Sequence, residues 1–319
     1  MSIQFDGKKI IVFGGSGFIG KHLVSRLSKY NCSIEIVTRK SGNNKELKFL
    51  GGLGQVKVKI SNSFDENHLK ALIKGSDIVI NLIGILYEKK NQKFENLHSH
   101  IPKTIAKVSK KVGVKNFLHL SSLGIDKNSF SKYALSKLEG EKNIRIEFPD
   151  SLVYRPSVVF GDEDSFINLF SKLSNFSPVM PIIGTPKIDF TAKLSSKLKF
   201  TEGVRFQPIY VGDLVEFIIK TSFEKAKTYD LAGPNIISFK KIMQLILSTK
   251  KKKRILLPVP LFIAKFMAFF MEKLPKPILT SDQVTLLKND NISQKGFENL
   301  KKKINFPKSL EIVISTYIK

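Results

Sequence analysis

Short apolar runs alternate with amphipathic stretches along the first half of this chain of 319 residues. The apolar runs are typical of strands buried on both faces of a parallel sheet, and the stretches between them repeat apolar residues at helical spacing. The predicted strands are 10–13, 33–38, 56–60, 77–82, 115–121 and 151–155, and the predicted helices are 18–30, 66–74, 91–112 and 131–146. This alternation predicts an α/β fold with a doubly wound parallel sheet.

The pattern becomes less regular in the second half of the chain. Prolines, a glycine and a polar run make 181–206 an irregular insertion, after which 207–232 returns to the order of the first half. From residue 233 to the C-terminus the pattern is mainly helical. The sequence therefore predicts a first domain over 1–180, to which 207–232 returns, and a smaller, mainly helical C-terminal domain over 233–319.

Three glycines at a spacing of three follow the first predicted strand: Gly14, Gly17 and Gly20. Gly14 permits a tight turn, Gly17 lets the backbone approach a pyrophosphate without an intervening Cβ atom, and Gly20 lets the next helix pack closely on the strand. The free N–H groups at the N-terminus of that helix point toward an anion. Strand, glycine-rich turn and helix in this order predict a dinucleotide site of the Rossmann type.

The end of the second predicted strand bears on which dinucleotide is bound. Proteins selective for NAD commonly hold the ribose 2′-hydroxyl with an Asp or Glu at this point. Here the strand ends Val-Thr-Arg-Lys at 37–40, without an acidic residue, and the guanidinium of Arg39 suits a 2′-phosphate. The sequence therefore favours NADP(H), with NAD(H) as the alternative.

Tyr133 and Lys137 stand four residues apart in a predicted helix, so their side chains lie on one helix face. A nearby ammonium group favours the phenolate, so we expect Tyr133 to exchange a proton near neutral pH, while Lys137 also holds the cofactor ribose. Ser122, at the end of the fifth predicted strand, is placed to polarise a substrate carbonyl. Ser122, Tyr133 and Lys137 are the candidate catalytic residues.

Composition narrows the classes of function. Only six of the 53 basic residues are Arg and the lysines are spread over the whole chain, so the net charge of +26 does not predict a specific nucleic-acid surface. The five histidines include no pair at a helical metal-binding spacing, so no metal site is expected. Cys32 is the only cysteine, which excludes an intrachain disulfide and fits a reducing compartment.

Localisation depends on apolar segments and on one basic run. No apolar run reaches the length needed to cross a bilayer, and no signal or transit peptide precedes the first strand, so the sequence predicts a cytoplasmic protein. Residues 250–271 combine a Lys-Lys-Lys-Lys-Arg run with an apolar stretch, as in peripheral docking to an anionic membrane or to a hydrophobic partner. A core helix that follows a solvated lysine turn is the alternative. A peripheral place on the inner face of the cytoplasmic membrane therefore stays open.

Several motifs resemble the short-chain dehydrogenase/reductase superfamily in its extended or atypical branch. They are Gly-Gly-Ser-Gly-Phe-Ile-Gly at 14–20, Asn-Leu-Ile-Gly at 81–84, Phe-Leu-His-Leu-Ser-Ser at 117–122, and the Tyr133–Lys137 pair. Segments 155–161, 207–213 and 279–284 are similar to the nucleotide-binding accessory subunit of respiratory complex I and its bacterial homologues. The resemblance spans nearly the full length of the chain.

This resemblance implies NADPH held tightly in a Rossmann domain, with a structural or assembly role at NADH:ubiquinone oxidoreductase or another quinone-linked membrane complex. A neighbouring branch linked to ubiquinone biosynthesis makes an active NADP-dependent oxidoreductase, epimerase or dehydratase the alternative. The candidate cofactor-binding residues are Gly14, Gly15, Ser16, Gly17, Phe18, Ile19, Gly20, Arg39, Asn62, Leu82, Ile83, Gly84, Ser121, Tyr133, Lys137 and Pro156.

Three departures from the superfamily put catalysis in question and leave cofactor binding untouched. His98 stands where many catalytic relatives have an Asn, and the interval from Ser122 to Tyr133 is shorter than in extended members. An insertion at 186–202 replaces what is usually a short link.

Overall fold

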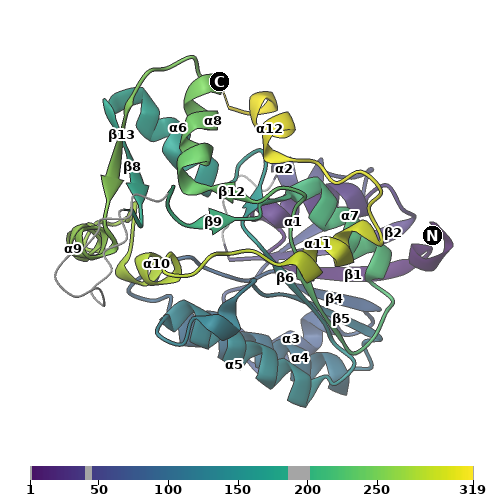
Figure 1. Ribbon diagram of the computed structural model, residues 1–319. Helices are drawn as coiled ribbons and strands as arrows, with labels where there is room; N and C mark the ends of the chain where they lie inside the picture. The colour runs from purple at the N-terminus through teal and green to yellow at the C-terminus, as the bar shows by residue number, and fades with distance from the viewer. Residues whose placement is uncertain (1, 40–44, 186–201, 319) are drawn as a thin grey trace.

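A computed structural model describes residues 2–39, 45–185 and 202–318. Seven parallel strands form one sheet in the order β11–β6–β5–β4–β1–β2–β3 (Figure 1). These strands are β1 (Lys8–Phe13), β2 (Cys32–Thr38), β3 (Val56–Ile60), β4 (Ile78–Asn81), β5 (Asn116–Leu120), β6 (Leu152–Pro156) and β11 (Lys227–Leu231). All six predicted strands are confirmed, and β11 adds a seventh at the edge beside β6. The strand order reverses beside β1, which creates the crevice where doubly wound sheets bind ligands.

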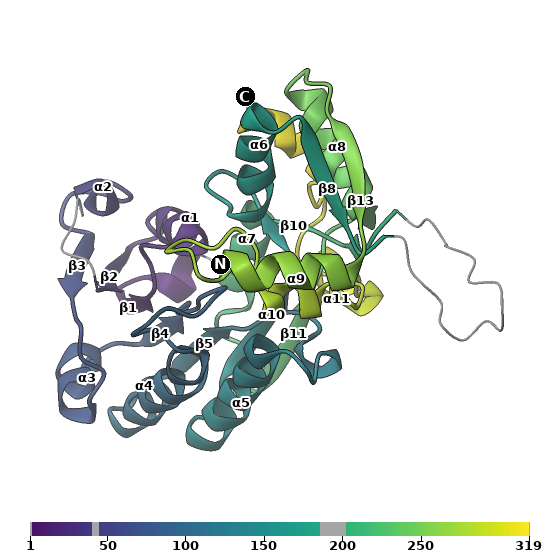
Figure 2. The same ribbon diagram turned by 90° about the vertical axis from the view of Figure 1, so that its left-hand side faces the viewer.

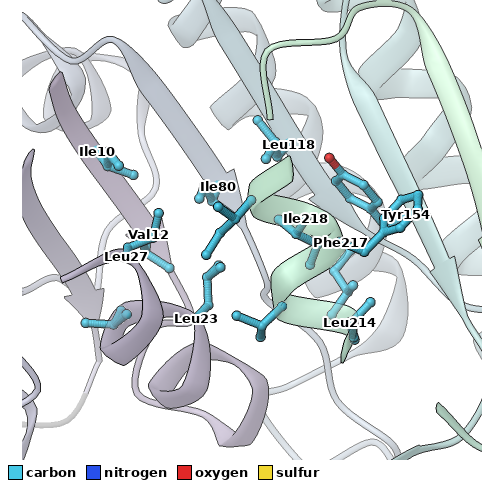
Figure 3. Packing of buried hydrophobic residues seen from close by; sticks show 14 of the residues in the cluster. Ile10, Val12, Leu23, Leu27, Ile80, Leu118, Tyr154, Leu214, Phe217 and Ile218 are labelled. Carbon is cyan, nitrogen blue, oxygen red and sulfur yellow. The ribbon is translucent and has the colours of Figure 1, made fainter. Parts of the chain in front are cut away.

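Helices cover both faces of this sheet (Figure 1, Figure 2). One face carries α1 (Phe18–Leu27), α7 (Val211–Thr221) and α11 (Gln294–Lys301), and the other carries α3 (Glu66–Ile73), α4 (Ile101–Lys111) and α5 (Lys132–Glu147). Successive residues of β1 point to opposite faces, and from Ile10 to Phe13 both sets are apolar and buried. Figure 3 shows Val12 of β1 close to Leu23 of α1, in a cluster that also includes Phe217 of α7. The sheet is therefore buried on both faces, as its continuous apolar runs predict.

The predicted helix 91–112 is divided into a π-helical segment, η2 (Glu95–His100), and α4. Pro102 lies in the first turn of α4 and has no N–H to donate to the carbonyl of His98. That carbonyl instead lies against α5 at Gly140, where a Cβ atom would be only 1.9 Å from the oxygen. The proline therefore changes the helical register, and Gly140 accommodates the carbonyl.

Most of the remaining elements form a second group beside the sheet (Figure 1). Its longer members are α6 (Phe166–Phe176), β8 (Val179–Ile183), α8 (Phe239–Thr249), β13 (Ile255–Val259), α9 (Leu261–Met271), α10 (Ser281–Leu286) and α12 (Leu310–Val313). Its short strands are β7 (Val159–Phe160) paired with β10 (Ile209–Tyr210), and β9 (Arg205–Phe206) paired with β12 (Ile237–Ser238). The short elements α2 (Lys45–Lys48), η1 (Ser2–Phe5), η3 (Ile125–Lys127) and η4 (Ile314–Thr316) complete the description.

A separate hydrophobic core holds this second group together. It includes Phe170, Met180, Phe206, Phe239 and Ile246, all buried. The helical character expected of the C-terminal region is confirmed, but β13, which pairs with β8, was not predicted because Pro258 interrupts its pattern. Proline is tolerated there because β13 has only one partner strand. The domain limits at 180 and 233 stay predictions, and residues 186–201 of the predicted insertion lie outside the described residues.

Candidate functional site

A cavity of about 660 Å³ lies at the carboxyl ends of β1, β4, β5 and β6 and continues to the second group of elements. Most of the predicted site residues line it. These are Gly14, Gly17, Phe18, Ile19, Gly20, Leu82, Gly84, Ser121, Ser122, Tyr133, Lys137 and Pro156. The structure therefore brings the predicted cofactor-binding and catalytic residues to one cavity, although their roles stay predictions.

Five predicted residues lie outside the cavity lining. Gly15 and Ser16 belong to the loop itself, and the Ser16 hydroxyl lies 3.2 Å from that of Thr38 at the end of β2. The amide of Ile83 donates to the Asn81 side chain at 3.1 Å. The last two, Arg39 and Asn62, are exposed just beyond β2 and β3. Both lie at the carboxyl edge of the sheet, where the adenosine end of a dinucleotide is expected.

The glycine loop has the geometry that the spacing predicts. Gly14 has φ of +77°, a left-handed conformation that favours glycine. A Cβ atom on Gly20 would lie 2.6 Å from the Gly14 carbonyl oxygen, so this glycine allows α1 to pack against the loop. Gly17 is the N-cap of α1 and offers no side chain to its first N–H groups. These N–H groups therefore suit an anion.

Lys137 and Ser122 approach the same end of the cavity from α5 and from the end of β5. The buried ammonium of Lys137 donates to the carbonyl of Leu120 at 3.1 Å. Burial lowers the pKa of Lys137 to about 8. A Cβ atom on Gly84 would lie 3.3 Å from Lys137 Nζ, so the glycine keeps space beside the ammonium.

The pKa of Tyr133 is shifted by its surroundings in the fold. Burial raises the pKa of Tyr133, a hydrogen bond with Ser122 partly opposes this shift, and the carboxylate of Asp282 adds to it. Desolvation therefore acts against the expected effect of the Lys137 ammonium, which is directed at a backbone carbonyl. Proton exchange by Tyr133 near neutral pH stays a prediction.

Asp282 of α10 caps the helix that carries Tyr133. Its carboxylate accepts hydrogen bonds from the Ser131 hydroxyl at 2.8 Å and from the amides of Lys132 at 2.7 Å and Tyr133 at 3.2 Å. A carboxylate at a helix N-terminus is stabilised by free N–H groups and by the helix dipole. The resemblance of segment 279–284 to the accessory subunit is the sequence signal that marks this region. The residues that Asp282 contacts lie about 150 positions away in the chain, so the contact itself could not be predicted.

Two buried histidines support the loops around the cavity. His98 accepts from the amide of Ile85 at 3.1 Å and its other ring nitrogen lies 2.9 Å from the Ser136 hydroxyl. Burial lowers the pKa of His98 to about 2, so its ring is neutral. In His119, Nδ1 lies 3.1 Å from the Asn81 amide nitrogen. Both rings hold neighbouring segments in place. No short sequence motif indicates this role.

Asn291, in the loop that follows α10, connects the two groups of elements at the cavity. Its side chain accepts from the Ser157 hydroxyl at 2.6 Å and donates to the carbonyl of Leu123 at 3.0 Å. Its backbone carbonyl accepts from the amide of Gln207 at 3.0 Å. Asn291 is not predicted as a site residue, because a lone Asn in a loop carries no recognisable sequence pattern.

Metal ligands and membrane spans are absent from the part of the chain that the structure describes. Within it, no group of three or more His, Cys, Asp or Glu side chains is placed to hold a metal ion. Over the same ranges, 2–39, 45–185 and 202–318, no helix has the length and apolar character needed to cross a bilayer.

Known proteins share part of this sequence or the same fold. The NmrA-like family matches residues 6–147. Two solved structures share the fold. A triphenylmethane reductase from Citrobacter sp. has a TM-score of 0.73 at 17% identity, and the match covers 97% of this chain and 99% of that chain. A UDP-glucose 4-epimerase from Thermus thermophilus in complex with NAD has a TM-score of 0.63 at 15% identity, and the match covers 86% of this chain and 98% of that chain. At such low identity they establish the fold alone.

A mitochondrial protein is more closely related in sequence. NADH dehydrogenase (ubiquinone) 1 alpha subcomplex subunit 9 of Mus musculus is 30% identical over 284 residues, which cover 88% of this chain and 71% of the mouse protein. Proteins of the same name from Arabidopsis thaliana and Dictyostelium discoideum match at 29%. The chain therefore belongs to the alpha subcomplex subunit 9 family, an atypical branch of the short-chain dehydrogenase/reductases.

Proposed function

We propose that this protein binds NADP(H) and serves as an accessory or assembly component of NADH:ubiquinone oxidoreductase. The observation that carries the nucleotide site is the glycine loop, where the space next to Gly17 is open and the first N–H groups of α1 have no side-chain cap. A second observation supports the fit: the buried Ser121 hydroxyl lines the cavity and has no hydrogen-bond partner among the described residues. Family membership supports the partner.

The chain supplies a group for each part of the dinucleotide. The amides of α1 suit the pyrophosphate, and Lys137 and Tyr133 suit the ribose next to the nicotinamide. Arg39 is exposed beyond β2, and no acidic residue ends that strand, so a 2′-phosphate would be attracted where a carboxylate would repel it. This is the reason to prefer NADP(H) to NAD(H).

Mass spectrometry of the nucleotide released by denaturing the purified protein tests the cofactor. We expect one NADP(H) per chain, retained through gel filtration, because a structural cofactor exchanges slowly. Protein that carries no dinucleotide and binds none when titrated would overturn the proposal. The partner is tested separately, by asking whether the native protein co-sediments with NADH:ubiquinone oxidoreductase activity.

We also propose that α9 provides a peripheral membrane contact. Only Ala264 and Ala268 of this helix are buried, whereas Phe262 and Phe266 are 62% and 67% exposed. Figure 2 places α9 on the near face of the molecule. The exposed phenylalanines disfavour the core helix considered as an alternative, and an exposed apolar surface of this kind supports docking to a membrane.

The basic residues nearest α9 differ from those expected. The run 250–254 contacts α6, where Lys252 donates to Asn175 at 2.7 Å and Arg254 to the Ser174 carbonyl at 3.0 Å, and β13 separates the run from α9. Lys265 lies within α9, and Lys273 lies over the ring of Phe269 at 5.2 Å. Lysines beside exposed aromatic rings suit anionic lipids.

Flotation with phosphatidylcholine vesicles, with or without phosphatidylglycerol, tests this contact. We expect binding that requires phosphatidylglycerol and is lost in Phe266→Asp. The matched control is Phe306→Asp, because Phe306 is 89% exposed and lies outside α9. Equal binding by wild type and Phe266→Asp would contradict the assignment.

An active NADP-dependent oxidoreductase, epimerase or dehydratase is the second candidate. The observation that favours it is that Ser122, Tyr133 and Lys137 line one cavity. Bound reduced cofactor supplies a hydride, and a protonated Tyr133 is suited to donate the accompanying proton to a carbonyl oxygen. Rapid nucleotide exchange during purification would favour this candidate over a structural role.

A further inference from the structure

The cavity has an apolar section beyond the predicted nucleotide site. Phe166, Leu169 and Phe170 of α6 line it, together with Phe206 of β9 and Phe239 of α8. Apart from Leu169, these side chains belong to, or pack against, the second hydrophobic core, so their positions are fixed by packing. A preformed apolar wall favours an aliphatic ligand, because each buried methylene group contributes to binding.

The same cavity is also lined by polar groups. They include the hydroxyls of Ser122 and Tyr133 and the side chains of Asn128 and Asn291. Lys137 is the only Lys or Arg among the described residues that line the cavity. The wall offered by α6 and α8 therefore lacks the cations that would hold a second phosphate group, which disfavours sugar nucleotides.

The rim of the cavity is also apolar. Leu86 and Ile278 line the cavity and are 53% and 45% exposed. Gln283 of α10 donates to the Leu86 carbonyl at 3.4 Å, so the two sides of this rim are in contact. Ile278 follows α9 by a few residues, which places the opening next to the exposed apolar helix. A ligand that partitions into an apolar phase can reach the cavity by this route.

We propose that the cavity binds a lipid-like molecule with one uncharged oxygen function, a carbonyl or a hydroxyl. The oxygen lies at Ser122 and Tyr133, and an aliphatic or isoprenoid chain lies along Phe166, Leu169 and Phe170. A charged group is disfavoured along Phe166, Leu169 and Phe170, because its burial among apolar side chains is costly. This assignment of ligand class rests on the proposed nucleotide site, which forms the other part of the same cavity.

A homologous series of methyl ketones, from 2-butanone to 2-undecanone, tests the ligand class on nucleotide-loaded protein. Binding is measured by calorimetry and by the fluorescence of bound NADPH. We expect the affinity to rise by about twofold or more for each added methylene group, against the roughly fourfold that complete burial allows. An affinity that is independent of chain length would overturn the proposal.

Two substitutions of Leu169 locate the chain within the cavity. Leu169→Gln makes the wall polar and Leu169→Trp fills the space, so both are expected to abolish the chain-length dependence while 2-butanone binds as before. Phe176→Gln is the matched control, because Phe176 ends the same helix and is 89% exposed. Unchanged chain-length dependence in both Leu169 variants would overturn the proposal.

The nucleotide content of each variant separates this inference from the proposed function. Wild-type protein that neither carries nor binds a dinucleotide refutes the nucleotide site itself. Protein that retains the dinucleotide but binds long and short ketones equally refutes only the lipid-like ligand. The variants are compared by thermal unfolding, and Leu169→Trp keeps the proposal testable if Leu169→Gln fails to fold.

Discussion

Replacing Gly17 with Ala is expected to remove nucleotide binding and leave the fold intact. Gly17 has φ of −81° and ψ of 175°, an extended conformation that alanine also adopts. A Cβ atom at this position would meet only the Gly14 carbonyl oxygen, at 3.4 Å, which is an ordinary van der Waals contact. The protein itself therefore has room for the methyl group, whereas a pyrophosphate that contacts this backbone does not.

The expected change in stability is small because two effects oppose each other. Alanine is a poorer N-cap than glycine, which costs up to about 1 kcal/mol. Removing a glycine also restricts the unfolded chain, which stabilises the folded state by about 0.4–1 kcal/mol. We therefore expect the free energy of unfolding to change by less than about 1 kcal/mol, while dinucleotide affinity falls at least tenfold, or by about 1.4 kcal/mol.

Gly20→Ala provides the contrasting variant in the same loop. Its Cβ atom would lie 2.6 Å from the Gly14 oxygen and 2.6 Å from the Gly15 Cα atom, so the backbone must move. We expect this variant to lose about 1–3 kcal/mol of stability as well as nucleotide binding. A matched pair thus separates damage to the fold from damage to the site.

Urea unfolding of nucleotide-free protein and calorimetric titration with NADPH measure the two quantities independently. The reasoning is refuted if Gly17→Ala binds NADPH as tightly as wild type, because no dinucleotide then approaches this backbone. It is also refuted if Gly17→Ala unfolds as readily as Gly20→Ala, because the space next to Gly17 is then not open.

Three further predictions concern the other side chains of the site. Arg39→Ala should weaken NADPH binding by about ten- to a hundredfold and leave NADH binding nearly unchanged, since only NADPH has a 2′-phosphate; equal losses would show that Arg39 does not select the cofactor. Tyr133→Phe removes only a hydroxyl, so nucleotide retention should persist under mass spectrometry, while any reductase activity should fall by roughly 10²–10⁴. Burial lowers the pKa of Lys137 to about 8, so between about pH 8 and pH 10 the unfolded chain holds a proton that the folded protein has lost, and the cost of burying the Lys137 charge is progressively relieved as pH rises. The unfolding free energy of nucleotide-free wild type relative to Lys137→Met should therefore increase by roughly 2 kcal/mol from about pH 7 to about pH 10, and a constant difference would contradict the burial argument.

Local patterns in the sequence were sufficient to predict the sheet and the glycine loop. The six predicted strands have continuous apolar runs, and a strand buried on both faces needs such a run whatever its neighbours are. The loop is equally local, because it depends on the positive φ of Gly14 itself and on the close approach of Gly20 to the backbone of Gly14 and Gly15. Tyr133 and Lys137 could be paired because helical spacing places both on one face.

Contacts between distant segments could not be predicted in this way. Asp282 and Asn291 complete the site from the second group of elements, and neither the turn chemistry nor the periodicity around them identifies a partner. The raised pKa of Tyr133 likewise depends on burial by the whole fold, whereas the sequence suggested only the charge of Lys137. The division of 91–112 was missed because the effect of Pro102 depends on where α5 packs.

The cap that Asp282 places on α5 has a consequence for how the protein is made. At roughly 5–20 residues per second, residue 282 is synthesised about 7 to 30 seconds after Tyr133. During this interval the sheet strands up to β11 have been translated, but the first turn of α5 lacks its acceptor and the cavity lacks one wall. The nascent chain therefore holds an unfinished site until its last segments emerge, and a chain cut short before residue 282 would retain the glycine loop without a complete cavity around Tyr133.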